Sequence, residues 1–225
     1  MNFKIVERPQ LKVIFCLPGE SFSHNFLMSW TELLQALPGQ GITPIFSPAQ
    51  SSVVYYVRNL CLCGDLRRGI NQKPFNGQLP YDYIMWLDSD IVFKPEHFFR
   101  LLGHKKDIIS GVYKMKGGQN FATVRKWDEG FFQKNGHFQF LTEQDLADES
   151  APVEMDYTGL GFTLVKYGVF ESFDYPWFQP LFYDIGACHD FSAEDVSFCK
   201  IAKQRGYKIY IDPRVRVGHE KSIVY

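Results

Sequence analysis

The chain has 225 residues and a formal net charge of −1, and 45% of its residues are hydrophobic. A chain of this length and apolar content can bury a core, which excludes a disordered protein. The near-zero charge gives no electrostatic basis for binding nucleic acid or an anionic membrane. We therefore expect a single domain over residues 1–225 and no nucleic-acid partner.

The N-terminal segment and the cysteines indicate the cellular compartment. The first residues carry several charges and lack the apolar core and cleavage site of a signal peptide. No stretch approaches the roughly 20 apolar residues of a membrane-spanning helix. The five cysteines are odd in number and form no C-x-x-C pair, which favours free thiols over disulfides or a zinc site. We expect a cytoplasmic protein without an integral membrane segment.

The start of the sequence alternates between strand and helix patterns. Residues 11–17 form an apolar run that predicts a buried strand, broken at Pro18. Apolar residues then recur at helical spacing up to Pro38, after a serine that can cap the helix. Residues 42–46 predict a second strand, and a further helix follows it. Strand, helix and strand in this order predict the βαβ unit of a parallel sheet.

Two aspartates follow the next apolar run, at residues 83–87. This run predicts a strand buried on both faces. Asp88 and Asp90 come directly after it, and side chains two residues apart on an extended chain point the same way. Neighbouring carboxylates repel unless a cation or proton lies between them, and strand ends bind ligands in open α/β sheets. We expect a divalent-metal site; the simpler alternative is a turn before the helix at Pro95.

The second half of the sequence is more varied. Residues 107–113 predict another buried strand. Between residues 121 and 142, aromatic runs flank an Asn-Gly pair, which predicts an antiparallel hairpin insertion. Residues 171–190 are aromatic and read as irregular. Ser192 and Asp195 have the spacing of a capping box at the start of a helix. Short strands are expected at residues 153–157, 162–165, 207–211 and 214–217.

The order of these motifs resembles a GT-A glycosyltransferase of the family 2-like kind, which uses nucleotide sugars. The matching positions are Pro18-Gly19 at a strand end, Arg58-Asn59 on a helix, Asp88-Ser89-Asp90, the strand at residues 107–113, Gly159-Leu160-Gly161-Phe162, Glu194-Asp195-Val196 and Val217-Gly218-His219. No single motif is specific, but together they extend from about residue 12 to residue 219. The resemblance implies an α/β fold with a mixed, mostly parallel central sheet flanked by helices and a small antiparallel insertion. It also implies a nucleotide-binding half over residues 1–113 and an acceptor and catalytic half over residues 114–225.

The resemblance further implies transfer of a sugar from a nucleotide-diphosphate sugar to a hydroxyl of a glycan, glycolipid or glycoprotein. A divalent cation, manganese or magnesium, would neutralise the leaving diphosphate. Asp90 is the expected direct ligand and Asp88 is shared between the metal and the ribose. His219 is a third metal ligand or a diphosphate contact. The residues expected to contact the nucleotide sugar are Pro18, Glu20, Arg58, Asp88, Ser89, Gly159 and Gly161.

An inverting transfer needs a carboxylate that takes the proton of the acceptor hydroxyl. We expect Asp195 to be this base and Glu194 to hold the acceptor. A helix N-terminus lowers the pKa of a carboxylate, so positioning rather than basicity would have to promote the step. The simpler alternative is that both acids only stabilise the helix. The rings considered for stacking on acceptor sugars are Tyr157, Trp177, Phe178 and Tyr183.

Three other functions fit parts of the sequence. A phosphatase of the haloacid dehalogenase type would use Asp88 as nucleophile, but that family places the motif near the N-terminus and adds a late acidic pair. A non-catalytic protein that binds carbohydrate or nucleotide could share the fold. A nucleotidyltransferase would need a glycine-rich, basic phosphate loop after Leu17, and the sequence has none there.

Overall fold

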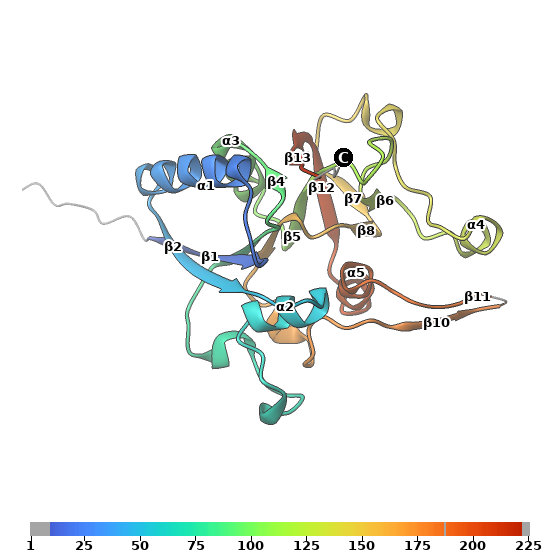
Figure 1. The fold of residues 1–225 in the computed structure, drawn as a ribbon, viewed down its shortest axis with the longest axis horizontal. Coiled ribbons are helices and arrows are strands. Elements are labelled where there is room, and N and C mark those ends of the chain that lie inside the picture. The colour runs from blue at the N-terminus through green and yellow to red at the C-terminus, as the bar shows by residue number, and fades with distance from the viewer. Residues whose placement is uncertain (1–9, 187, 222–225) are drawn as a thin grey trace, which may run out of the picture.

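In the computed structural model, residues 10–186 and 188–221 are described, and seven strands of this part form a central sheet (Figure 1). The strands, in their order across the sheet, are β2 (Ile42–Ala49), β1 (Leu11–Pro18), β3 (Tyr83–Leu87), β9 (Phe162–Lys166), β5 (Ile108–Val112), β12 (Ile209–Arg216) and β7 (Val153–Met155). Strand β9 runs antiparallel to β3 and β5, and β7 runs antiparallel to β12. The other strands of the sheet run in one direction. The mixed, mostly parallel sheet expected from the sequence is confirmed.

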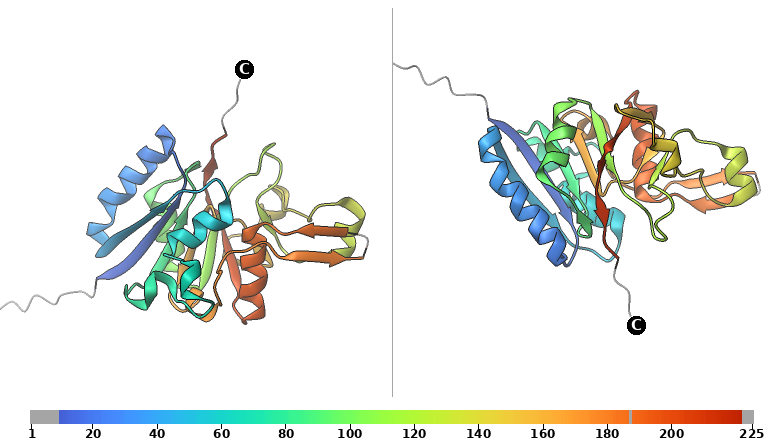
Figure 2. Two further views of the ribbon diagram at one scale, coloured as in Figure 1. Left: turned by 60° about the horizontal axis from the view of Figure 1, so that its bottom comes forward. Right: turned by 90° about the horizontal axis from the view of Figure 1, so that it is seen from above.

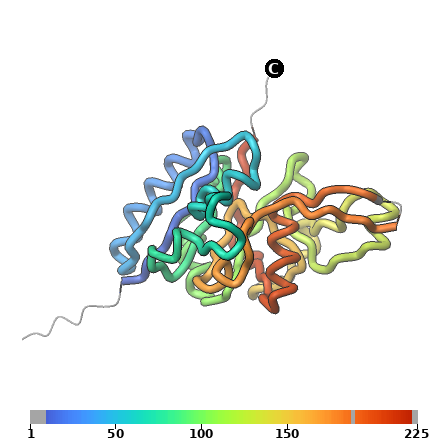
Figure 3. The backbone as a smooth tube through the Cα atoms, turned by 90° about the horizontal axis from the view of Figure 1, so that it is seen from below, coloured from blue at the N-terminus to red at the C-terminus, as the bar shows by residue number. Residues whose placement is uncertain are grey.

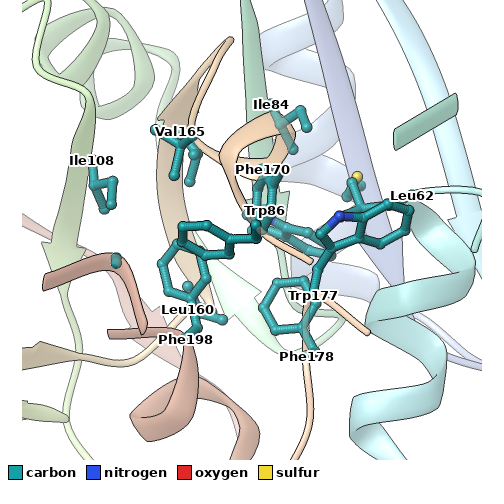
Figure 4. Packing of buried hydrophobic residues seen from close by; sticks show 14 of the residues in the cluster. Leu62, Ile84, Trp86, Ile108, Leu160, Val165, Phe170, Trp177, Phe178 and Phe198 are labelled. Carbon is teal, nitrogen blue, oxygen red and sulfur yellow. The ribbon is translucent and has the colours of Figure 1, made fainter. Parts of the chain in front are cut away.

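Helices cover both faces of the sheet. Figure 1 shows α1 (His24–Ala36) and α3 (Pro95–Gly103) on one side and α2 (Val54–Cys61) and α5 (Glu194–Gln204) on the other. Strand alternation divides the core accordingly. Val13 and Phe15 of β1 belong to the cluster that includes α1 and α3, whereas Ile14 and Cys16 belong to the cluster that includes α2 and α5. The buried aromatic rings of the second cluster are shown in Figure 4.

Several short elements surround the sheet. The short strands are β4 (Ile91–Val92), β6 (Thr123–Val124), β8 (Tyr157–Thr158), β10 (Phe182–Ile185), β11 (Cys188–Phe191) and β13 (Gly218–His219). They pair antiparallel as β4 with β13, β6 with β8, and β10 with β11. A short helix, α4, spans Glu129–Asn135. Single 3₁₀ turns span Pro38–Gln40, Leu66–Arg68, Pro74–Gly77, Gln144–Leu146 and Phe170–Ser172. Within the described residues, no helix is both long and apolar enough to cross a bilayer.

The region between residues 121 and 142 differs from the predicted hairpin. Asn135 is the last residue of α4, and Gly136 follows in the left-handed conformation with φ of 71°. The Gly136 N–H donates to the carbonyl of Phe132 at 2.8 Å. An Asn-Gly pair suits a helix C-terminus as well as a hairpin turn because both require positive φ. The hairpin lies elsewhere, at β10 and β11, within the stretch predicted to be irregular (Figure 2).

Two predicted boundaries are also wrong. Helix α5 begins at Glu194 with Ala193 as its N-cap and has no side-chain cap. The hydroxyl of Ser192 instead accepts from Leu181 N at 2.9 Å, so the predicted capping box is absent. The two predicted final strands are joined in β12, which continues through Pro213.

Candidate functional site

One edge of the central sheet collects the polar residues identified in the sequence. Strands β3 and β5 end at this edge, and Asp88 and Tyr113 follow them directly. Strand β9 runs the other way, so the loop of residues 159–161 before it lies at the same edge. The backbone N–H of Asp88 donates to the carbonyl of Gly161 at 3.0 Å. Segments distant in the sequence thus meet where open α/β sheets bind ligands.

The loop after β1 lies against the aspartate loop. A Cβ atom on Gly19 would lie only 2.9 Å from the Cβ of Ser89, so this approach requires glycine. Pro18 is buried as the last residue of β1, whereas Glu20 is exposed. The predicted donor contacts on these two loops are therefore neighbours.

Asp88 and Asp90 have different partners. Arg58 Nη2 donates to Asp88 Oδ2 at 3.0 Å. Asp90 Oδ2 lies 3.2 Å from His219 Nε2 and 2.7 Å from Lys221 Nζ. Burial would raise the pKa of Asp90, but hydrogen bonds with His219 and Lys221 lower it to about 2. The hydrogen bond with Asp90 in turn raises the pKa of His219.

Asp90 and His219, two of the predicted metal ligands, lie side by side. Strand β13 pairs with β4 so that His219 lies opposite Ile91, next to Asp90. His219 Nδ1 lies 2.8 Å from the carbonyl of Lys114, which leaves Nε2 directed at Asp90. Carboxylate oxygen suits manganese or magnesium, and histidine is a common ligand of metals in general. Among residues 10–186 and 188–221, no three His, Cys, Asp or Glu side chains form a possible metal-binding group. A cation here would take its remaining ligands from substrate or water.

Arg58 joins the two acidic motifs in the interior. Its Nε donates to Glu194 Oε1 at 2.9 Å, while Nη2 contacts Asp88. The Arg58 side chain is buried at 4% exposure, and its guanidinium carbon lies 5.4 Å from the centroid of the Trp86 ring. Burial alone would lower the pKa of Arg58, but Asp88 and Glu194 raise it above its ordinary value. The guanidinium therefore stays charged, and its contact with a nucleotide stays a prediction.

Asp195 lies in the first turn of α5, against Tyr157. The Tyr157 hydroxyl donates to Asp195 Oδ2 at 2.8 Å. Burial and the neighbouring Glu194 carboxylate raise the pKa of Asp195 to about 6, against the lowering effects of Tyr157 and Arg58. The sequence led us to expect a carboxylate weakened as a base by the helix dipole. A pKa of about 6 instead leaves Asp195 ionised at neutral pH and more basic than an ordinary aspartate.

Tyr113 lies at the centre of this arrangement. Its hydroxyl accepts from the N–H of Gly161 at 3.1 Å, and its ring centroid lies 5.0 Å from that of His219. A Cβ atom on Gly159 would overlap the Tyr113 hydroxyl. The structure therefore gives both glycines a packing role, and their contact with a ligand stays a prediction. Sequence reasoning missed Tyr113 because it reads as one more aromatic residue at the end of a buried strand.

Three cavities border the candidate residues. One, of about 560 Å³, extends from His219 and Lys221 to Lys114, Lys116 and Arg216. A second, of about 290 Å³, has Asp195 in its wall, and a third, of about 320 Å³, adjoins the second. The first cavity thus borders His219, and the second borders Asp195.

Two of the rings considered for sugar stacking are core residues instead. Trp177 and Phe178 are 0% exposed and pack near Trp86 (Figure 4). Tyr157 is also buried, but it borders the cavity at Asp195. Tyr183 is partly exposed and borders the same cavity. The last two rings therefore stay candidates for an acceptor contact.

Comparisons with known proteins show a similarity of fold. No protein-family model matches the sequence, and no curated protein matches it significantly. The crystal structure of A197 from STIV has a TM-score of 0.52 and 17% sequence identity, over 96% of this chain and 97% of that one. GalNAc-T7, solved with UDP, GalNAc and Mn²⁺, has a TM-score of 0.51 and 10% identity, over 96% of this chain. The chain spans 45% of the length of GalNAc-T7.

The inositol-1-phosphate CTP transferase from T. maritima covers 95% of this chain and 90% of its own, with 8% sequence identity. Its TM-score is only 0.45, so this similarity supports no inference. The first two similarities show the fold alone, because their identities are 17% and 10%. The chain has a Rossmann-like fold of the GT-A kind, as its sequence motifs implied.

Proposed function

We propose that the chain is a glycosyltransferase that moves a sugar from a nucleotide-diphosphate sugar to an acceptor hydroxyl, with inversion and with a divalent cation. The observation that carries the proposal is the buried contact of Arg58 with both Asp88 and Glu194. It holds the acids after β3 beside the acids that begin α5. The shared fold with GalNAc-T7, whose structure contains UDP, GalNAc and Mn²⁺, supports the proposal.

On the donor side, Asp90 and His219 would hold manganese or magnesium, with Asp88 directed at the metal or the ribose. The bound cation would neutralise the charge that grows on the leaving diphosphate. The cavity of about 560 Å³ beside this pair contains Lys114, Lys116 and Arg216, which suit a diphosphate. The other proposed donor contacts are Pro18, Glu20, Arg58, Ser89, Gly159 and Gly161. In this proposal the donor contacts come from both residues 1–113 and residues 114–225, and residues 114–225 also supply the acceptor side.

On the acceptor side, Asp195 accepts the proton of the hydroxyl that attacks the anomeric carbon. The new bond forms on the face opposite the leaving diphosphate, whose bond to the anomeric carbon breaks, so the configuration inverts. The Tyr157 hydroxyl fixes the orientation of Asp195, and Arg58 fixes Glu194 next to it. In this proposal Glu194 holds the acceptor.

The contact between Arg58 and Asp88 also bears on the phosphatase alternative. A nucleophilic Asp88 would need a free carboxylate oxygen facing a phosphate. Here one of its oxygens accepts a hydrogen bond from a buried guanidinium, and the other lies 3.0 Å from Arg58 Nη1. Asp88 Oδ1 accepts no hydrogen bond among the described residues, but the nearby guanidinium charge orients the carboxylate, which favours a positioning role for Asp88 over a nucleophilic one.

Calorimetric titration with UDP-, GDP-, dTDP- and CDP-sugars, each with and without manganese, tests the proposal. We expect one nucleotide to bind with an affinity that manganese increases, and the bound sugar to be released slowly to water. Failure of every donor to bind would contradict the proposed function. Binding without hydrolysis or transfer to any acceptor would favour the non-catalytic alternative.

A further inference from the structure

Two adjoining cavities lie between α4, the β10–β11 hairpin and α5. The smaller, of about 290 Å³, reaches Asp195, and the larger, of about 320 Å³, reaches Lys200 and Lys203. Phe132 and Phe138 border both cavities, which makes them neighbouring compartments of one groove. Figures 2 and 3 show that α4 and the hairpin project together from the end of the molecule away from β1 and β2. We call these two compartments the aromatic groove.

Partly exposed aromatic rings form much of the wall of the aromatic groove. They are Trp127, Phe132, Phe138, Phe140 and Tyr183. The rings support one another, because the centroid of Phe138 lies 4.8 Å from that of Phe132 and 4.9 Å from that of Trp127. The Lys200 ammonium lies 3.6 Å from the centroid of Tyr183 and anchors α5 to the hairpin. The rings therefore have defined positions before any ligand binds.

The aromatic groove has more acids than lysines and arginines in its wall. The compartment at Lys200 and Lys203 also contains Asp128 and Glu129, so two cations face two acids. The compartment at Asp195 contains a second acid, Asp190, and no lysine or arginine. The cavity beside His219 is different, because four cations and a single acid line it. An anionic acceptor would be repelled at Asp195, whereas a neutral one would not.

Flat rings together with scattered polar groups match the surface of a sugar. A pyranose presents C–H groups on its face, which pack on aromatic rings, and hydroxyls at its edge, which bond to polar side chains. A lipid chain would bury the charged groups of the groove without hydrogen bonds, which is unfavourable. The compartments, of about 290 and 320 Å³, each have room for a sugar ring.

We propose that the acceptor is a neutral oligosaccharide that places its reacting sugar beside Asp195 and the next sugar in the compartment at Lys200 and Lys203. This inference rests on the proposed function, because it takes Asp195 as the base. It narrows the acceptor from any hydroxyl compound to an uncharged glycan of at least two rings. Phe138, between the compartments, contacts both sugars.

Saturation-transfer NMR with glucose, maltose, cellobiose, lactose and their phosphorylated forms tests the inference without a donor. We expect at least one neutral disaccharide to bind about tenfold more tightly than its monosaccharide, because a second ring is stacked. Phe138→Ala should remove this difference. Phe138→Leu, which keeps the apolar volume but not the flat ring, should remove most of it. Phe46→Ala on β2, where the ring is half exposed outside the groove, is the matched control and should change nothing.

Donor binding and donor hydrolysis, measured on the same variants, separate the two proposals. We expect Phe138→Ala to leave both unchanged while transfer to a disaccharide is lost. The inference would be overturned if the donor binds normally but the protein does not prefer disaccharides. Normal donor binding with a preference for phosphorylated acceptors would overturn it as well. If a disaccharide binds in a way that depends on Phe138 but the protein binds none of the nucleotide sugars, the result would support the groove and contradict the proposed function.

Discussion

Arg58 and Glu194, which are 136 residues apart in the sequence, are joined by a buried hydrogen bond of 2.9 Å between Nε and Oε1. The other side of the same guanidinium binds Asp88. Buried ion pairs are costly to form and more costly to break, because removing one partner leaves the other charge unpaired. The geometry of both acidic motifs therefore depends on one arginine.

Replacing Arg58 with methionine should destabilise the protein by about 3–5 kcal/mol, since Glu194 is only 7% exposed and would lose its cation. Urea denaturation followed by tryptophan fluorescence measures the change. Arg67→Met, which removes an ion pair with Asp65 from a side chain that is 83% exposed, is the control and should have little effect. Similar stabilities for the two variants would contradict the structural role of Arg58.

Asp195→Asn should lower the rate of sugar transfer by about 10² to 10⁴, because asparagine cannot accept the proton of the acceptor hydroxyl. Donor affinity should stay unchanged, since Asp195 lies on the acceptor side. Asp174→Asn, which removes a largely exposed acid paired with Arg205, serves as the control. Full transfer activity in Asp195→Asn would assign the base to another residue.

The pH dependence of transfer provides an independent test of the same base. The pKa of Asp195 is about 6, so transfer should fall below pH 6 as the carboxylate becomes protonated and should level off above it. The Tyr157 hydroxyl lowers this pKa by hydrogen bonding to the ionised form. Tyr157→Phe should therefore move the inflection of the rate profile to higher pH. A shift to lower pH, or a profile without inflection near pH 6, would contradict the assignment.

Much of the fold follows from local signals in the sequence. The apolar run at residues 83–87 and the helical spacing before Pro38 depend only on neighbouring residues, and both elements form as predicted. The grouping of Asp88 with the loop at residues 159–161 follows from a general rule, because strand ends meet at one edge. The Asn-Gly pair at Asn135 failed as a signal because helix ends and hairpin turns both need positive φ.

Long-range contacts in the site could not be predicted in the same way. Nothing near Arg58 in the sequence indicates that it pairs with Glu194, since the two meet only after α2 and α5 pack on the same face. The pKa of Asp195 depends on burial as well as on its helix position, so the helix alone gave the wrong direction. Composition does not separate Trp177 in the core from Tyr183 at the cavity.

Asp90→Ala should abolish the increase in donor affinity that manganese produces, because Asp90 is the proposed direct ligand. Calorimetric titration of the donor with and without manganese measures the difference. Asp107→Asn is the matched control, since Asp107 precedes β5 and lies at the opposite edge of the sheet. A manganese effect that persists in Asp90→Ala would exclude this carboxylate as the metal ligand.

Gly159→Ala tests whether Tyr113 fixes the loop before β9. The added Cβ would overlap the Tyr113 hydroxyl and lie 2.9 Å from Cζ, so we expect a loss of about 1–3 kcal/mol of stability. In a Tyr113→Phe background the hydroxyl is gone, so Gly159→Ala should reduce the free energy of unfolding by less. Denaturation of the wild type, both single variants and the double variant gives the coupling between the two residues. Additive effects would show that the loop can move away from Tyr113 and would contradict a packing role of Gly159 against this ring.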